Sequence, residues 1–214
     1  MKLLALHSAQ SDNMIVIMST PLKRTATSRK DVSHERIVEV AARAIRRSGY
    51  RGIGVADLMK EAGLTHGGFY AHFASRDALL AEAADRASAE GLAKMERIAA
   101  SVKPQQALAT LLQAYLSKEH VEEVESGCAL AALGSEMPRQ SPEVRCVITR
   151  RIKEMIDLIS RQSPAWGQSG AHEQALVTIA TMVGTLILAR AVDDPKLSDA
   201  LREAALKHFS PTSD

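Results

Sequence analysis

Cysteines are scarce in this chain of 214 residues, and the motifs that many enzymes share are missing. The two cysteines, Cys128 and Cys146, are too few for a disulfide framework, and no CxxC motif is present. The sequence has no HExxH, GxGxxG, phosphate-loop or GxSxG motif, and no carboxylate pair stands out in an apolar setting. We therefore expect no catalytic residue, no metal site and no cofactor, and an enzyme is the less favoured class.

Long apolar runs are missing as well. The longest uncharged apolar stretch, residues 175–189, is shorter than the roughly 18 residues that span a bilayer. The apolar run near the first residue is too short for a signal peptide. With 46% hydrophobic and 24% charged residues, the composition is typical of a soluble globular protein. We therefore expect a cytoplasmic protein with reduced thiols.

Acidic residues are outnumbered in one part of the chain only. Residues 21–76 hold 11 Lys and Arg against 5 Asp and Glu, whereas residues 77–214 hold 15 against 19. The net charge of +2 conceals this asymmetry. A basic first third joined to a mildly acidic remainder indicates a polyanion-binding module attached to a second unit.

The chain is predicted to be all-α, with about nine helices. Its long runs rich in alanine, leucine, arginine and glutamate lack proline, and no stretch alternates as a strand does. Residues 1–32 lack helical periodicity and are interpreted as a flexible basic arm. Beyond residue 100, breaks at proline and glycine predict five helices. They are expected near residues 104–120, 124–138, 141–163, 171–193 and 195–209.

The pattern between residues 33 and 80 predicts a helix-turn-helix domain. Ser33 is expected to cap a first helix that ends at Gly49. A short second helix at about 55–62 ends at Gly63, where a positive φ is needed. Thr65 is expected to cap the third helix, and Ser75 to cap a long fourth helix that ends near residue 100. Two short helices joined by so short a turn are the outline of a helix-turn-helix. Residues 81–214 would then form a second, helical domain.

The third helix contains three of the seven aromatic residues. Phe69, Tyr70 and Phe73 follow two adjacent glycines, Gly67 and Gly68, although each glycine inside a helix costs about 1 kcal/mol relative to alanine. Phe69 and Phe73 are four residues apart and can pack inward together. The glycines remove side-chain bulk where a recognition helix approaches the major groove. We interpret the segment as one that sacrifices helical propensity for closeness to double-stranded DNA.

The run GVADLMKEAGLTHGGFYAHFASRDALL resembles the DNA-binding domain of the TetR family of bacterial transcriptional regulators over about residues 34–85. The resemblance implies a ligand-responsive regulator, expected to be a repressor, that binds DNA as a homodimer. It places base reading at His66 and Gly67, phosphate contacts at Thr65, Tyr70, His72 and Arg76, and a basic arm at Arg29 and Lys30. Gly68 is expected to let the backbone approach the DNA. Because the glycines offer no side chain for base reading, His66 and the short second helix, with Asp57 and Lys60, must contribute more.

The last two predicted helices are candidates for the dimer interface. Residues 171–193 are apolar nearly all round, and small or apolar residues form one stripe: Ala180, Gly184 and Leu188. Pairing of helices 171–193 and 195–209 with their copies would give a four-helix interface, which the resemblance also implies. A two-fold dimer would place two recognition helices one DNA turn apart and predicts a palindromic operator. An internal core helix in a monomer is the alternative.

An effector pocket is expected among the fourth to eighth helices, because DNA binding alone does not need 130 further residues. Its predicted lining is Met95, Leu112, Tyr115, Cys128, Met137, Met155, Ile159 and Trp166. Side chains of these types more often belong to plain core than to a ligand site, so plain core is the alternative for each of them. Redox or electrophile sensing through Cys128 is an alternative function, although Glu123 and Glu125 oppose a reactive thiol. An architectural DNA binder without a pocket is a third.

Overall fold

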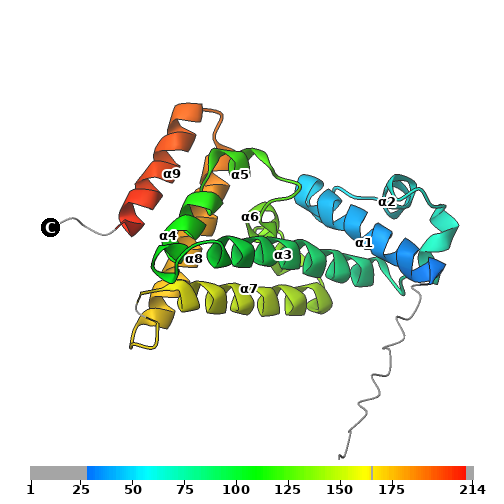
Figure 1. The fold of residues 1–214 in the computed structure, drawn as a ribbon. Helices are drawn as coiled ribbons and strands as arrows, with labels where there is room; N and C mark the ends of the chain where they lie inside the picture. The colour runs from blue at the N-terminus through cyan, green and yellow to red at the C-terminus, as the bar shows by residue number, and fades with distance from the viewer. Residues whose placement is uncertain (1–27, 165, 211–214) are drawn as a thin grey trace, which may run out of the picture.

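The computed structural model describes residues 28–164 and 166–210, and it contains helices and turns without a β-strand in those ranges (Figure 1). The all-α prediction is confirmed. The first elements along the chain are α1 (Arg29–Ser48), α2 (Val55–Glu61), the 3₁₀ helix η1 (His66–Ala71) and α3 (Arg76–Ala100). The remainder comprises α4 (Pro104–Tyr115), α5 (Lys118–Glu122), α6 (Ala129–Leu133), the 3₁₀ helix η2 (Met137–Arg139), α7 (Pro142–Gln162), α8 (Ala171–Ala191) and α9 (Pro195–Phe209).

The first helix begins earlier than its sequence pattern predicts. Ser28, not Ser33, is the N-cap, and its hydroxyl accepts a hydrogen bond from the backbone N–H of Asp31. The Asp31 carboxylate in turn accepts from the backbone N–H of Ser28, which completes a capping box. This reciprocal pair starts the helix at Arg29. The predicted arm is therefore wrong for residues 28–32, and its residues 1–27 lie outside the described part of the chain.

Two glycines end the first two helices as predicted. Gly49 follows α1 with a φ of 72° and Gly63 follows α2 with a φ of 70°, in the left-handed region that other residues rarely adopt. Four residues separate the end of α2 from the start of η1. It is a 3₁₀ helix and not the α-helix that was expected, because six residues with two glycines do not sustain α-helical hydrogen bonding.

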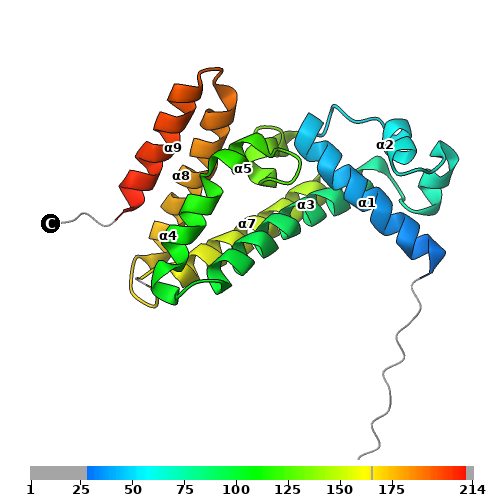
Figure 2. The ribbon, with the colours of Figure 1, turned by 45° about the horizontal axis from the view of Figure 1, so that its top comes forward.

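The second half of the molecule is built on two long helices. α3 and α7 run side by side, with α1 and α2 at one end of the molecule and α8 and α9 at the other (Figures 1 and 2). Ser75 caps α3 as predicted. The helix expected at 104–120 instead ends at Tyr115, and Ser117 caps the separate α5. The helix expected at 124–138 is only α6 and η2; the buried Gly127 precedes α6 and Gly134 follows it.

Two apolar cores fill the molecule. The first joins α1, α2, η1 and the first half of α3 to α6, η2 and the start of α7. The second lies between the end of α3, α4, the end of α7, α8 and α9. Because the first core crosses the boundary predicted at residue 80, the helix-turn-helix shares its interior with the helices that follow it.

Candidate nucleic-acid interface and cavity

The segment η1 separates its aromatic side chains between the interior and solvent. Phe69 and Phe73 are 2% and 3% exposed, and their rings stack with centroids 5.6 Å apart. Tyr70, the neighbour of Phe69, is 75% exposed. The inward packing predicted for the two phenylalanines is confirmed. The buried pair anchors η1 to the first core and thereby holds the Tyr70 ring out in solvent.

The adjacent glycines of η1 are not required by the protein's own packing. A Cβ at Gly67 would meet no atom within 4 Å, and one at Gly68 would lie 3.7 Å from Met59 Cε, an ordinary contact. Neither glycine has a positive φ. Neither the available space nor the backbone conformation requires glycine at these two positions. If glycine is required there, the reason is a contact with another molecule.

His72 lies at the edge of this surface, partly covered by α1. Its ring centroid is 6.0 Å from that of His34, which stacks on Phe73 and contacts Glu82 Oε2 through Nε2 at 2.6 Å. Burial, followed by the neighbouring His34 and Lys30 charges, lowers the pKa of His72. The His72 Nδ1 atom is enclosed without a hydrogen-bond partner. The ring is therefore held by packing and is less exposed than that of Tyr70.

The other residues predicted to contact DNA form no single cluster. Thr65 and His66 are exposed at the start of η1; Thr65 occupies the predicted N-cap position, but its side chain makes no capping hydrogen bond. Arg76 donates to the Tyr50 carbonyl oxygen and, at 3.4 Å, to that of Ile53, so it fastens α3 to the turn after α1. The predicted arm residues Arg29 and Lys30 and the α2 residues Asp57 and Lys60 are exposed.

The helix α8 exposes an apolar face at the opposite end of the molecule. Its side chains are as much as 58% exposed, and the apolar residues on this face are Leu176, Val177, Ala180, Ile187 and Leu188, with Gly184 half-buried between them. Within the described residues, α8 is also the one helix long and apolar enough to cross a membrane, with a mean hydropathy of 1.5. Its other face packs in the second core beside α7 and α9.

A cavity opens between α3, α4, α7 and the segment that leads into α6. It holds about 70 Å³, several times the roughly 10–15 Å³ that one water needs. Four predicted lining residues do line it: Met95, Tyr115, Cys128 and Met155. The other four do not. Leu112 and Ile159 are packed into the second core, Met137 belongs to the first core, and Trp166 is 58% exposed in the loop before α8.

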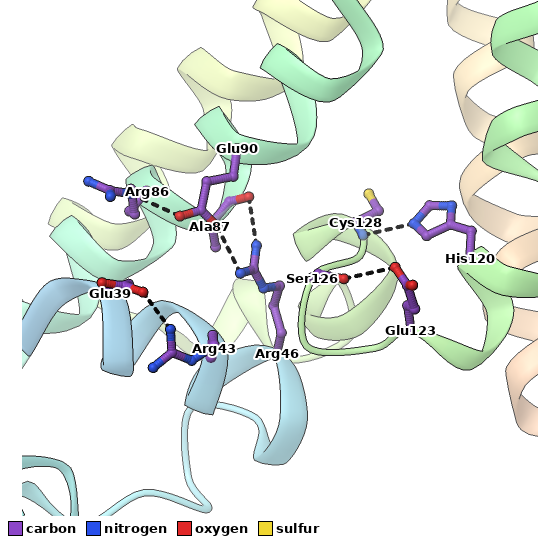
Figure 3. A network of polar contacts seen from close by, with 10 residues as sticks. All are labelled: Glu39, Arg43, Arg46, Arg86, Ala87, Glu90, His120, Glu123, Ser126 and Cys128. Carbon is purple, nitrogen blue, oxygen red and sulfur yellow. Dashed lines mark hydrogen bonds and ion pairs between the residues drawn. The ribbon is translucent and has the colours of Figure 1, made fainter. Parts of the chain in front are cut away.

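The polar end of this cavity consists largely of residues that the sequence did not single out. His120 Nδ1 lies 2.6 Å from the Tyr115 carbonyl oxygen, and because a carbonyl only accepts, this nitrogen carries the proton. His120 Nε2 therefore accepts from the Cys128 backbone N–H at 3.1 Å (Figure 3). Burial is the main cause that lowers the pKa of His120. The neutral ring thus fixes the position of Cys128 in the cavity wall.

Arg190 approaches the same region from α8. Its Nε donates to the Val121 carbonyl oxygen at 3.1 Å and its Nη2 to that of His120 at 2.6 Å, while Nη1 is enclosed without a partner. Burial lowers its pKa. It forms no ion pair with any carboxylate of residues 28–164 or 166–210. A single arginine at the end of an apolar helix is a signal that could have identified it from sequence.

Contacts connect the cavity to α1. The buried Arg46 donates through Nη1 to the carbonyl oxygen of Ala87, a cavity residue, at 3.1 Å and through Nη2 to Glu90 at 2.9 Å (Figure 3). Arg47 pairs with Glu125 at 3.2 Å. The last turn of α1 is thus held to α3 and to the segment before α6, both of which line the cavity.

The described residues show no cluster of three or more His, Cys, Asp or Glu side chains that could hold a metal ion. The surface around η1 instead has an exposed tyrosine, two glycines without a packing role, and exposed basic residues on α1 and α2. An exposed tyrosine hydroxyl and exposed basic side chains are each suited to phosphate contacts.

Comparison with known proteins identifies relatives that are transcriptional regulators with a helix-turn-helix. The family model described as "Bacterial regulatory proteins, tetR family" matches residues 37–83. An uncharacterized HTH-type transcriptional regulator of Mycobacterium tuberculosis is 29% identical over 168 residues, covering 73% of this chain and 83% of that protein.

Solved structures share the fold over most of the chain. A TetR transcriptional regulator from Chloroflexus aurantiacus is 25% identical with a TM-score of 0.70, covering 84% of this chain and 94% of that one. The reduced form of NemR from E. coli is 21% identical with a TM-score of 0.70, covering 83% and 94%. A TetR-family regulator from Cytophaga hutchinsonii is 19% identical with a TM-score of 0.72, covering 85% and 95%.

Proposed function

Because the chain belongs to the TetR family of bacterial transcriptional regulators, we propose that it is a cytoplasmic repressor that binds a palindromic operator as a homodimer. In this proposal η1 enters the major groove, and a small molecule in the cavity releases the protein from DNA.

The observation that carries the DNA-binding part is the division of η1 between Phe69 and Tyr70. The phenylalanine is buried and the adjacent tyrosine is 75% exposed; the Tyr70 ring meets the Phe69 ring edge to face, and most of its surface is open to a contact from outside the chain. A tyrosine hydroxyl at this position can donate to a phosphate oxygen. The exposed backbone at Gly67 would lie against the groove, with His66 beside it for base contacts.

The apolar face of α8 supports the homodimer. Such a face is costly to leave in water, and a second copy of α8 and α9 would cover it. Gly184 has no neighbour within 4 Å of a Cβ position, so a partner helix could approach closely there. A two-fold axis through this face would relate two η1 segments, as a palindromic operator with half-sites one DNA turn apart requires.

The test is fluorescence anisotropy with labelled duplexes that tile the DNA flanking the gene, with random-sequence duplex as competitor. We expect one palindromic duplex to bind far more tightly than the competitor, with an affinity that falls as salt rises. Tyr70→Phe removes only the hydroxyl and should weaken binding about tenfold, since a hydrogen bond to a charged group contributes about 1.5 kcal/mol. Tyr70→Ala and His72→Ala should also weaken binding while the protein stays folded. Unchanged affinity in all three variants would refute the docking.

A second candidate function concerns Cys128. Its thiol lines the cavity, and the Arg190 guanidinium interacts with it electrostatically, a cationic neighbour that the local sequence does not supply. In this alternative an electrophile modifies the thiol and so releases DNA. Cys128→Ser would then abolish release by electrophiles but keep release by non-reactive ligands, whereas Cys146→Ser, at an exposed thiol on α7, would change neither.

A further inference from the structure

Two residues that line the cavity have buried hydroxyl groups without an adequate hydrogen-bond partner. The Tyr115 side chain is 5% exposed, and apart from the nearby Cys128 thiol, a weak acceptor, its hydroxyl has no partner. The Ser88 hydroxyl, which also lines the cavity, is enclosed without a partner. Burial raises the pKa of Tyr115 well above its usual value, so its hydroxyl keeps its proton and can donate. Buried polar groups left unmatched in this way indicate a polar atom supplied by a ligand.

The charged residues that line the cavity are all basic. Among the described residues that line it there is no aspartate or glutamate, whereas Lys94 and Arg151 are present. Arg151 is neutralised by Asp85 and Glu154, and Lys94 is 4.0 Å from Glu123. Arg190 has no such compensation.

The Arg190 guanidinium lies directly behind the cavity wall at Gly127. A Cβ at Gly127 would be 2.8 Å from Arg190 Nη2, so the glycine allows the guanidinium to approach. The contacts of Arg190 are carbonyl oxygens, which leave its full charge unbalanced next to a low-dielectric space. A ligand ammonium group would find no negatively charged group there, whereas a ligand carboxylate would find the positively charged guanidinium.

We propose that the cavity takes a small organic monocarboxylate with an apolar body, such as an aromatic acid. Its carboxylate accepts from the Tyr115 hydroxyl and faces the positive charge of Arg190, and its apolar body lies against Met95, Leu111 and Met155. The ligand class stands on the cavity alone, and its role as the effector rests on the proposed function. The side chains around the cavity thereby indicate that the ligand is an anion, which the backbone fold alone does not.

The test uses three probes of one shape: para-toluate, para-toluamide and para-methylbenzylamine. Calorimetric titration of the full chain without DNA should show the acid binding at least about tenfold more tightly than the amide, and the amine not at all. Tyr115→Phe should weaken the acid about fivefold or more. Tyr50→Phe is the matched control, because its hydroxyl is also enclosed without a partner but lies in the first core, and it should change nothing.

Arg190→Met should remove the preference for the acid over the amide; if that variant does not fold, Tyr115→Phe decides. Equal or tighter binding of the amide or the amine overturns the proposal, as does an unchanged affinity in Tyr115→Phe. Operator anisotropy on the same samples separates this result from the proposed function. A protein that binds the palindrome but not the acid refutes only the ligand class. One that binds the acid and no DNA supports the ligand class and refutes the repressor.

Discussion

Replacing Gly67 by alanine should change the stability of the protein and its proposed affinity for DNA in opposite directions. The new Cβ would meet no atom within 4 Å, and the φ of Gly67 is not positive, so the folded chain accommodates it without strain. Removing glycine also reduces the entropy of the unfolded chain, so unfolding should become harder by up to about 1 kcal/mol. If the Gly67 backbone lies against the groove, the methyl group must displace it, and operator affinity should fall roughly ten- to hundredfold.

The assay pairs urea unfolding at fixed protomer concentration with operator anisotropy at fixed salt. Gly91→Ala is the matched control, because its Cβ also meets nothing and the residue lies inside α3, away from η1. It should gain similar stability and keep its operator affinity. Gly68→Ala, whose Cβ would face Met59, should fall between the two. Full affinity in Gly67→Ala would show that the glycine pair has nothing to do with closeness to DNA.

Two other perturbations test the dimer face and the buried histidine. Leu188→Glu places a charge on the exposed face of α8 and should convert the proposed dimer to a monomer in analytical sedimentation. Val32→Glu, at a similarly exposed apolar residue of α1, should leave the dimer intact. A dimer that persists in Leu188→Glu would locate the interface elsewhere. His120 has a folded-state pKa below its unfolded value of about 6.5, so the folded state binds fewer protons and stability should fall as pH drops below that value. His120→Gln should make unfolding free energy depend less on pH between about 7.5 and 5.5, whereas exposed His172→Gln should not, and an unchanged slope would refute a neutral His120.

The features predicted correctly from the sequence are those that local chemistry determines. Gly49 and Gly63 end helices because a left-handed residue must follow there, and Ser75 caps α3 through its own hydroxyl. Phe69 and Phe73 pack together because their spacing places them on one face. The start of α1 was predicted incorrectly because two serines near it can each act as an N-cap. Ser28 and Ser33 are both plausible caps, and the reciprocal bond with Asp31 decides for Ser28.

The cavity was only partly predictable because its polar end is assembled from distant segments. Tyr115 and Cys128 are recognisable as candidates in the sequence. Their relation to Arg190 depends on α8 packing beside α5 and α6, which no local pattern encodes. Methionine and tryptophan were favoured for their adaptable or large side chains, and packing placed Met137 in the first core and Trp166 in solvent. Side-chain type predicts that a residue suits a pocket, but only tertiary structure shows where the pocket lies.

In the proposed function the presence of a ligand in the cavity must be transmitted to α1, and the energies of the contacts between them rank the candidates. A change of operator affinity by one to two orders of magnitude needs a coupling free energy of about 1–3 kcal/mol. The Arg47–Glu125 pair is nearly half exposed on both sides, and such pairs contribute about 0.2–1 kcal/mol. Arg46 is 4% exposed, and its bonds to the Ala87 carbonyl and Glu90 contribute about 1.5–3 kcal/mol each. Arg46→Met should therefore reduce the ratio of operator affinities without and with effector severalfold, whereas Arg47→Ala should preserve most of it. The reverse ranking would move the coupling from α3 to the segment before α6.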